Sequence, residues 1–306
     1  MRTLTIDIGT NSTLYLIADL EGDNLRVVER GIAGNRLGAG KNEDGWLPPD
    51  LIEENRQILV KMIERGRALG CDAVKAVGTE ALRSAANSLE FLAMAASIGL
   101  GCETVDGERE ASLAWRGVVG NQKSTDMIAI LDIGGGSSEL IVGKSSVIEY
   151  ANSVPIGAVT ATRRFTSDPP PPAEIVELRK EAEKLLAGWL KILPMTCPLI
   201  GIAGTCTSLA SLGLRISEYK PGVLEGYRLS HRSVIVWKNK LLKMSLDERR
   251  VLPGMPPARA AILPAGAVIL EAAMRTIGKK GLRVSEKGLI FGLAWELAGG
   301  LKALSP

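Results

Sequence analysis

Two short stretches of the chain place an aspartate directly before a glycine turn, and both could bind phosphate. The first is "LTIDIGTNSTLYLIAD" and the second is "ILDIGGGSSELIVG", in which Asp7 and Asp132 end apolar runs. Backbone N–H groups freed by such a turn can point into one concavity and hold phosphate oxygens, and glycine permits close approach and positive φ angles. A carboxylate at each strand end could hold a hydrated cation or orient water. The pattern predicts two loops that clamp a phosphate chain.

Polar side chains in both loops add hydrogen-bond donors. The first loop continues with Thr10, Asn11 and Ser12, and the second reads Gly134, Gly135, Gly136, Ser137, Ser138. A plain hairpin turn is the alternative for either loop taken alone. The chain has no G-x-x-x-x-G-K-[ST] motif and no G-x-G-x-x-G that runs from a strand into a helix, which argues against a P-loop and a Rossmann fingerprint. Two matching turns favour phosphate binding over the plain hairpin.

The elements around the two loops form a repeated pattern. Residues 3–8, 12–19 and 24–30 read as three β-strands, and "MIAILDI", "SELIVG" and "SVIEYANS" repeat them later in the chain. Helical and strand patterns alternate after each set. Strands are expected over 73–79, 102–105 and 198–204, and helices over 48–70, 88–99, 107–119, 158–165, 173–193, 205–214 and 285–301. Ser88 could cap the helix over 88–99. The shared order predicts a duplicated domain.

Composition narrows the possible classes of protein. The chain has 306 residues, 46% hydrophobic and 23% charged, with a formal net charge of +3, which suits a globular protein with an anionic ligand and gives no support for nucleic-acid binding. Its single histidine, His231, excludes a histidine metal cage or a Ser-His-Asp triad, and the four cysteines form no C-x-x-C pair. No membrane-spanning run and no signal peptide are recognised, so we expect a cytoplasmic protein without a membrane partner.

Taken together, these motifs resemble the actin-like ATPase superfamily, which includes sugar kinases and heat-shock chaperones. Within it the chain is most similar to the exopolyphosphatase/guanosine pentaphosphate phosphohydrolase family. The stretches that carry the resemblance are "IDIGTNS", "VGTEALRSA", "DGEREASLAWRGV", "LDIGGGSSEL", "SVPIGAVTATRRF", "ERRVLPGMPPARAAILPAG" and "VSEKGLIFGL". The resemblance implies duplicated ribonuclease H-like α/β domains with an interdomain active-site cleft. Domain I would span 1–122 plus about 288–306, and domain II 123–287.

The resemblance also implies roles for individual residues. The family's general base falls on Glu110 in "DGEREA", where the alternative is a first-turn helix carboxylate that the macrodipole favours. Asp132 and Glu139 would hold Mg²⁺, or another divalent cation such as Ca²⁺ or Mn²⁺, with Asp7 as a further candidate. The phosphate-binding residues would be Asn11, Ser12, Arg83, Gly134, Gly135, Gly136, Ser137 and Ser138. Arg36 is a weaker candidate, and either arginine could instead be a surface charge.

The implied reaction is metal-assisted hydrolysis of a terminal phosphoanhydride. Inorganic polyphosphate is the first substrate expected, and guanosine pentaphosphate, which would connect the chain to the stringent response, is the second. A homodimer is expected from the resemblance alone. Two alternatives remain: a non-catalytic polyphosphate or nucleotide sensor, and a small-molecule kinase.

Three positions depart from the family's usual residues. Arg109 replaces a glutamate, which could lower the pKa of Glu110 or add a phosphate contact. Ala261 stands where aspartate is usual and Ile290 where arginine is usual. We interpret the last two as changes in structural support, although they leave open a shifted substrate or a lost activity.

Overall fold

The computed structural model describes residues 1–42, 44–120, 126–190, 192–194, 196–216, 218 and 220–299. The chain forms two compact units: unit 1 is Met1–Gln122 with Lys287–Pro306, and unit 2 is Lys123–Glu286. The expected boundary between residues 122 and 123, and the chain beyond residue 299, lie outside the described residues. Unit 1 is therefore built from two separate parts of the sequence.

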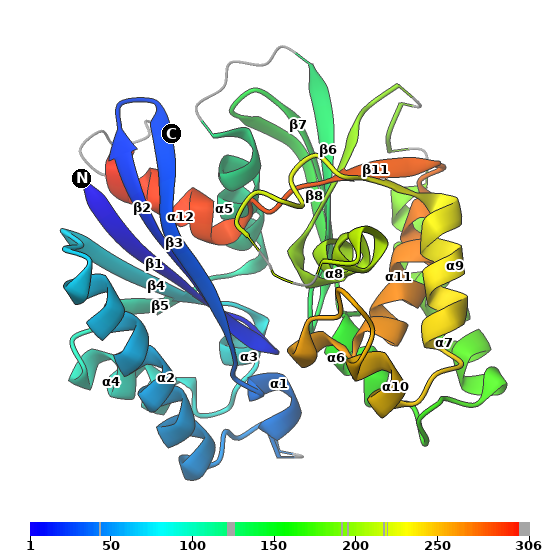
Figure 1. The fold of residues 1–306 in the computed structure, drawn as a ribbon, viewed down its shortest axis with the longest axis horizontal. Coiled ribbons are helices and arrows are strands. Elements are labelled where there is room, and N and C mark those ends of the chain that lie inside the picture. The colour runs from blue at the N-terminus through cyan, green and yellow to red at the C-terminus, as the bar shows by residue number, and fades with distance from the viewer. Residues whose placement is uncertain are drawn as a thin grey trace. The chain divides into compact units, whose positions relative to one another are not determined.

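Unit 1 is built on a five-stranded sheet (Figure 1). Its strands are β1 (Arg2–Ile8), β2 (Ser12–Glu21), β3 (Asn24–Gly34), β4 (Ala73–Gly78) and β5 (Cys102–Thr104), in the order β3-β2-β1-β4-β5. The first three strands are antiparallel neighbours, whereas β1, β4 and β5 run parallel. The carboxyl ends of β1, β4 and β5 therefore meet at one edge of the sheet, where the segments that follow them lie together.

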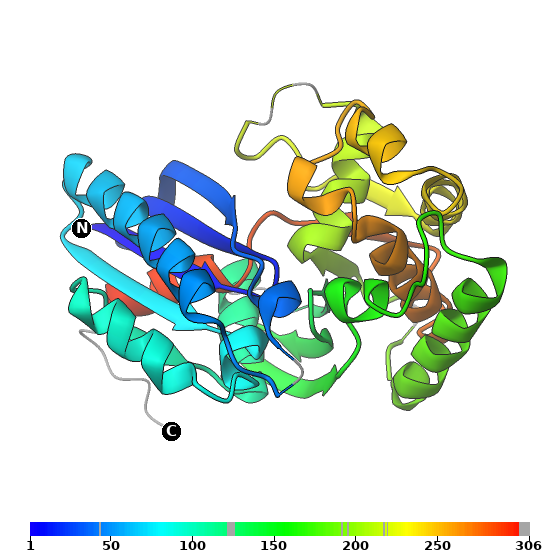
Figure 2. The same cartoon turned by 90° about the horizontal axis from the view of Figure 1, so that it is seen from below.

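Helices cover both faces of this sheet (Figure 2). They are α1 (Leu37–Gly40), α2 (Pro49–Ala68), α3 (Glu80–Arg83), α4 (Ser88–Ser97), α5 (Gly107–Val119) and α12 (Leu289–Gly299). Apolar side chains of α2 and α4 pack against β1 and β4 in one core, whereas α12 packs against β2 in another and meets α5 in a third. The final described helix thus completes the core of the first unit.

Unit 2 repeats the sheet with one additional edge strand. Its strands are β6 (Met127–Ile133), β7 (Ser138–Lys144), β8 (Val147–Val154), β9 (Leu199–Ile202), β10 (Arg228–Ser230) and β11 (Gly281–Val284), in the order β8-β7-β6-β9-β11-β10. The strands β6, β9 and β11 run parallel, as β1, β4 and β5 do. In unit 2 the pairing register of β7 with β8 shifts between Val142 and Gly143. In unit 1 the pairing register of β2 with β3 shifts between Ile17 and Ala18. In each unit this shift begins ten residues after the aspartate, which supports the duplication.

The helices of unit 2 surround α11, the most buried of them (Figure 1). They are α6 (Ala158–Thr162), α7 (Pro172–Leu185), α8 (Ala203–Leu214), α9 (His231–Leu241), α10 (Leu246–Arg250) and α11 (Leu263–Thr276), with 3₁₀ turns at Leu186–Trp189 and Pro257–Arg259. Their apolar faces form one large core with β6 and β7. Across the described residues, every helix is too short or too polar to cross a membrane.

The structure confirms the duplicated α/β fold and corrects several details. The helix expected over 173–193 ends at Leu185 and is followed by the 3₁₀ turn Leu186–Trp189. Asn87, not Ser88, occupies the N-cap position of α4, and its amide exchanges hydrogen bonds with the backbone of Leu47 instead of capping the helix. Ser88 is the first helical residue. The short strands β10 and β11 were not predicted, because three or four residues carry too little periodicity to be recognised.

Candidate functional site

The two glycine turns have the same backbone geometry. In loop 1 (residues 9–12) the Gly9 N–H donates to the Ser12 carbonyl at 3.1 Å, and in loop 2 (residues 134–137) the Gly134 N–H donates to the Ser137 carbonyl at 3.0 Å. A Cβ on either glycine would lie 3.2 Å from that carbonyl oxygen. Neither Gly9 nor Gly134 has a positive φ, so close approach explains these two glycines and the expected left-handed backbone does not.

A short helix is seated on each loop through a second glycine. The N–H of Gly38 in α1 donates to the Thr10 carbonyl at 2.6 Å, and a Cβ there would lie 2.1 Å from the Thr10 methyl. In unit 2, the N–H groups of Ala158 and Val159 in α6 donate to loop 2 carbonyls, and a Cβ on Gly157 would lie 2.4 Å from the carbonyl of Gly135. Both loops are therefore held rigidly from the side of the next helix.

The polar side chains of loop 1 are tied into unit 1. The Asn11 amide donates to the Ser12 hydroxyl at 3.1 Å, and the Thr10 hydroxyl donates to the Glu80 carboxylate at 3.1 Å. The same carboxylate accepts a bond from Ser84 at 2.9 Å. Glu80 was not among the predicted site residues; the local signal for it is its place three residues before Arg83 in α3, on the same face of a short helix.

Glu110 and Arg83 are brought together from different elements of unit 1. The Asp106 carboxylate caps α5 by accepting from the Arg109 N–H at 2.8 Å, which places Glu110 in the first turn. Arg83 Nη1, at the end of α3, donates to Glu110 Oε2 at 3.1 Å and to the Val105 carbonyl at 2.8 Å. Loop 1, α3 and α5 follow β1, β4 and β5, so all three lie at the carboxyl edge of the parallel strands.

Burial sets the protonation of Glu110. Its side chain is 19% exposed, and burial raises the pKa of the carboxyl above its usual range. The Arg83 guanidinium opposes this rise, whereas the neighbouring Glu80 carboxylate adds to it. A carboxyl with a raised pKa is a stronger base once ionised.

Asp132 and Glu139 face each other in unit 2. They are direct partners across the β6–β7 hairpin, so their side chains lie on the same face of the sheet. Glu139 is buried, and its Oε1 accepts a bond from the Ser153 hydroxyl at 2.7 Å. Two acids placed directly opposite repel each other, and a bound cation would offset that repulsion. Unit 1 has Asp7 opposite Leu14 at the equivalent positions, so it lacks the second acid.

The donor set fits a magnesium ion. No group of three or more histidine, cysteine, aspartate or glutamate side chains suited to a metal occurs among the described residues. Mg²⁺ typically keeps several waters and binds one or two carboxylates together with substrate phosphates, which the Asp132–Glu139 pair can satisfy. A site made by protein side chains alone, as Zn²⁺ prefers, is not formed by these two acids.

The serines of loop 2 are more enclosed than expected. Ser137 and Ser138 are both buried, and the Ser138 hydroxyl donates to the Ile156 carbonyl at 2.6 Å. That bond ties the start of β7 to the segment before α6, so the Ser138 hydroxyl is already engaged. The structure thus brings Asp132, Gly134, Ser137 and Glu139 to one sheet edge in unit 2, and Asp7, Asn11, Arg83 and Glu110 to one edge in unit 1.

Arg109 does not act on Glu110 as expected. Its guanidinium forms an ion pair with Glu296 of α12, and it makes no contribution to the pKa of Glu110, which is raised, not lowered. Successive residues of a helix point about 100° apart, so neighbours in the sequence face different partners. Of the two alternatives for Arg109, a lowered pKa of Glu110 is contradicted, whereas a phosphate contact stays a prediction.

The remaining candidates differ in their surroundings. Ile290 is buried against β2, which fits its expected structural role, whereas Ala261 is exposed in the turn before α11 and adds no core contact. Arg36 pairs with Glu54 at 2.6 Å, with both side chains more than half exposed. His231 lies 3.6 Å from the buried Glu271, consistent with a structural histidine.

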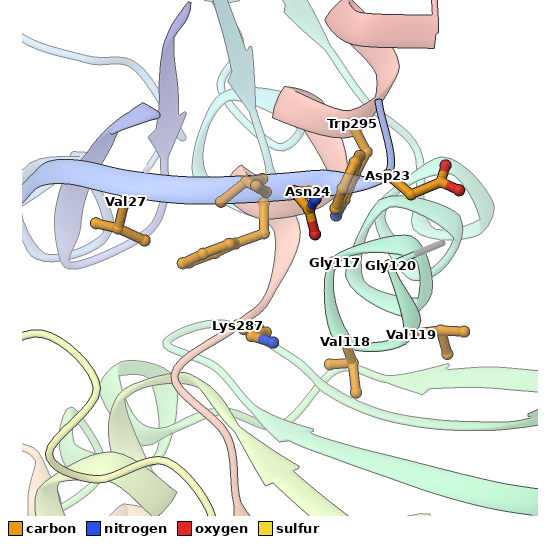
Figure 3. Close-up of a pocket in the computed structure, with 11 residues that line it drawn as sticks. Asp23, Asn24, Val27, Gly117, Val118, Val119, Gly120, Lys287 and Trp295 are labelled. Carbon is orange, nitrogen blue, oxygen red and sulfur yellow. The ribbon is translucent and has the colours of Figure 1, made fainter. Parts of the chain in front are cut away.

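A cavity of about 290 Å³ lies in unit 1 (Figure 3). Its wall is formed by the β2–β3 turn, the last residues of α5, and Lys287, Phe291 and Trp295. Glu110 lies in the first turn of α5, whereas the cavity is at the other end of that helix. None of the predicted site residues lines it.

Several known proteins are similar to this chain over nearly its whole length. The model of the Ppx/GppA phosphatase family matches residues 16–299. The chain is 31% identical to Exopolyphosphatase 2 of Mycobacterium tuberculosis, over 97% of this chain and 99% of that protein. Its structure resembles a Ppx/GppA family member from Aquifex aeolicus (TM-score 0.84, 30% identity, 99% of both chains) and an exopolyphosphatase from Cytophaga hutchinsonii (TM-score 0.88, 25% identity, 100% of both). The chain belongs to the Ppx/GppA phosphatase family, with its actin-like fold.

Proposed function

We propose that the protein is an exopolyphosphatase, which hydrolyses the terminal phosphoanhydride bond of inorganic polyphosphate and releases orthophosphate. The observation that carries the proposal is Glu110, a largely buried carboxylate braced by Arg83 at the same sheet edge as a glycine loop. Glycine loops are equally suited to kinases, whereas a braced carboxylate provides a means to use water as the acceptor. The relatives named exopolyphosphatase support the same class of substrate.

In this proposal Glu110 orients the attacking water and accepts its proton. Phosphoryl transfer passes through a loose transition state, so placing the water in line matters more than the strength of the base. Arg83 holds the carboxylate in position through Nη1. Its guanidinium carries further N–H donors that could contact a phosphate oxygen.

The two loops would hold the phosphate groups. Backbone N–H groups of Gly135, Gly136 and Ser137 in unit 2 would surround the terminal phosphate, while Asn11 and Ser12 in unit 1 would contact the same chain. Ser138 would act by fixing the loop, because its hydroxyl already donates to Ile156. We propose that unit 1 is domain I and unit 2 is domain II of the enzyme, and that both take part in this reaction.

Asp132 and Glu139 would hold Mg²⁺, directly or through water, with Asp7 as a further candidate. When bound, the metal neutralises charge on the phosphate oxygens during transfer. Ca²⁺ or Mn²⁺ could take the same oxygen donors, although Ca²⁺ requires more ligands, which water would have to provide.

The test is phosphate release from polyphosphate, from guanosine pentaphosphate, and from ATP with a panel of sugars, each with Mg²⁺. Wild type should release phosphate from polyphosphate at the highest kcat/KM, and Glu110→Gln should lower kcat by about 10²–10⁴-fold, the usual contribution of a general base. Glu108→Gln is the matched control: it changes an exposed glutamate of the same helix turn and should leave kcat within about twofold.

Each other outcome identifies a different function. Binding of polyphosphate without phosphate release would make the protein a sensor, and transfer to a sugar would make it a kinase. Faster release from guanosine pentaphosphate would reverse the order of substrates. Full activity in Glu110→Gln would remove Glu110 from the mechanism.

We further propose that the protein is a cytoplasmic homodimer, an inference supported by the family alone. Light scattering after size-exclusion chromatography would give twice the mass of one chain, and a single-chain mass at micromolar concentration would contradict it. Fractionation of the source cells would test the compartment.

A further inference from the structure

The helix that carries Glu110 is held at its far end by an unusually close helix crossing. A Cβ on Gly117 of α5 would lie 2.0 Å from the Gly288 carbonyl oxygen, and a Cβ on Gly292 of α12 would lie 1.9 Å from the Leu113 carbonyl oxygen. Arg116 also donates to the Trp295 carbonyl at 3.2 Å. With no side chain between the backbones, α5 cannot move sideways against α12 at this point.

A row of alternating charges holds the other end of α5. Glu103 of β5 pairs with Lys75 of β4 at 2.9 Å, Lys75 approaches Glu296 of α12 at 3.4 Å, and Glu296 pairs with Arg109 of α5. Burial raises the pKa of the Glu296 carboxyl, but Arg109 and Lys75 outweigh it and hold this pKa below its usual range. Glu296 is therefore ionised at neutral pH and links the sheet to the first turn of α5.

The direction of Arg109 determines the direction of Glu110. The close crossing limits translation of α5, but rotation of its first turn about the helix axis must be limited by contacts in that turn. Arg109 and Glu110 point about 100° apart. When Arg109 is bound to Glu296 on one side, Glu110 is turned toward Arg83 on another. The Asp106 cap holds the backbone of the same turn.

We propose that Glu296 is a positioning residue for the reaction, which acts through Arg109 to fix the rotation of the first turn of α5 and so the aim of Glu110. The proposal rests on the role of Glu110 proposed above. Glu296 touches no reacting atom in it, and its ion pair with Arg109 is the contact that matters.

The kinetic test is a set of single and double variants assayed with polyphosphate. Glu296→Gln and Arg109→Gln should each lower kcat by about threefold to tenfold and leave KM within about twofold, because a misplaced catalytic group affects the chemical step. The double variant should lose no more than either single one, since both remove the same ion pair. Glu296→Gln should add nothing in a Glu110→Gln background, and Glu296→Asp should recover part of kcat.

Glu103→Gln is the matched control. It removes a charge from the other end of the same row, next to Lys75, without a contact to α5. Its kcat should equal that of wild type even if its free energy of unfolding falls as much as that of Glu296→Gln. Equal kcat losses in the two variants, measured per folded molecule, would overturn the positioning role.

A second measurement does not depend on activity. The Arg109 and Glu110 N–H groups both bond to Asp106, so their hydrogen exchange reports order in this turn. Exchange in the peptide that contains them should be severalfold faster in Glu296→Gln and unchanged in Glu103→Gln. Unchanged exchange in Glu296→Gln would overturn the inference. If wild type fails to release phosphate, the proposed function is wrong, and the exchange result still decides whether Glu296 orders the turn.

Discussion

Loop 1 and loop 2 have the same turn and differ in nearly every side chain that could take part in catalysis. Gly9 and Gly134 make the same hydrogen bond, yet Thr10 and Asn11 correspond to Gly135 and Gly136. Across the hairpin, Asp7 faces Leu14, whereas Asp132 faces Glu139. Duplication has thus kept the backbone cradle in both units, while the acid pair lies in unit 2 and the braced Glu110 lies in unit 1.

Among the variants that compare the two loops, the largest effect should come from the acid that only unit 2 contains. Glu139→Gln should raise the Mg²⁺ concentration needed for half-maximal phosphate release by about 10–100-fold, the usual cost of disturbing a metal site. Asp7→Asn should raise it less, because Asp7 has no second acid across the hairpin. Titration of activity with Mg²⁺ measures both, and a larger shift for Asp7→Asn would place the metal on unit 1.

The next largest effect should come from Gly38 in α1 and Gly157 before α6, the glycines through which these short helices pack against the loops. Gly157→Ala places a Cβ 2.4 Å from backbone, whereas Gly38→Ala chiefly meets the Thr10 side chain. Both variants should lower the free energy of unfolding by about 1–3 kcal/mol. The loss should be larger for Gly157→Ala, because the backbone it meets cannot move aside as the Thr10 side chain can. Urea unfolding measures this, with Gly34→Ala, which has open space around it, as the control. Equal values for all three would show that the loops are not tightly seated.

The raised pKa of Glu110 predicts a pH dependence of stability. A carboxyl whose pKa is higher in the folded than in the unfolded state destabilises the fold as pH rises through the folded value, and has no such effect below about pH 4.3, the usual value for unfolded glutamate. Glu110→Gln should therefore be more stable than wild type at neutral pH, with the difference vanishing in acid. Urea unfolding between pH 4 and 8 would test this, with Glu108→Gln as the control. If Glu110→Gln and wild type have the same free energy of unfolding at every pH, Arg83 fully offsets the effect of burial on the pKa of Glu110.

The smallest effect concerns the residue where β9 of unit 2 passes into α8, and its equivalent at the end of β4 in unit 1. Ala203 of unit 2 has a φ of 59°, a conformation that costs a non-glycine residue about 1–2 kcal/mol. Ala203→Gly should stabilise the protein by about 0.5–1 kcal/mol after the entropy cost of glycine is subtracted. Gly78 is the equivalent residue of unit 1, and Gly78→Ala should destabilise because its Cβ would lie 2.4 Å from Leu82. A loss of stability in Ala203→Gly would contradict the strain at that residue.

The sequence predicted the repeated strands well, because alternating apolar runs that end in Asp-Ile-Gly are a strong local signal. Glu110 and Arg83, which the resemblance to the family proposed as site residues, are in contact in the fold although they lie 27 residues apart in the sequence. It could not show where Arg109 points, because its partner Glu296 is 187 residues away and no local pattern links them. The contact of Thr10 with Glu80 and that of the Ser138 hydroxyl with Ile156 also lie beyond local patterns, because they form only in three dimensions.

The return of α12 to unit 1 has a consequence for the order in which the protein is made. Unit 2 is continuous in sequence, and its described part is complete before α12 is synthesised. Unit 1 begins first and finishes last, because Gly117 and Leu113 of α5 stay uncovered until Gly288 and Gly292 leave the ribosome. Domains that fold during synthesis usually do so from the N-terminus onward. Here the nascent chain would hold Glu110 on an unfinished helix packing site until residue 299 emerges, so the core of unit 1 should close only after α12 has been synthesised.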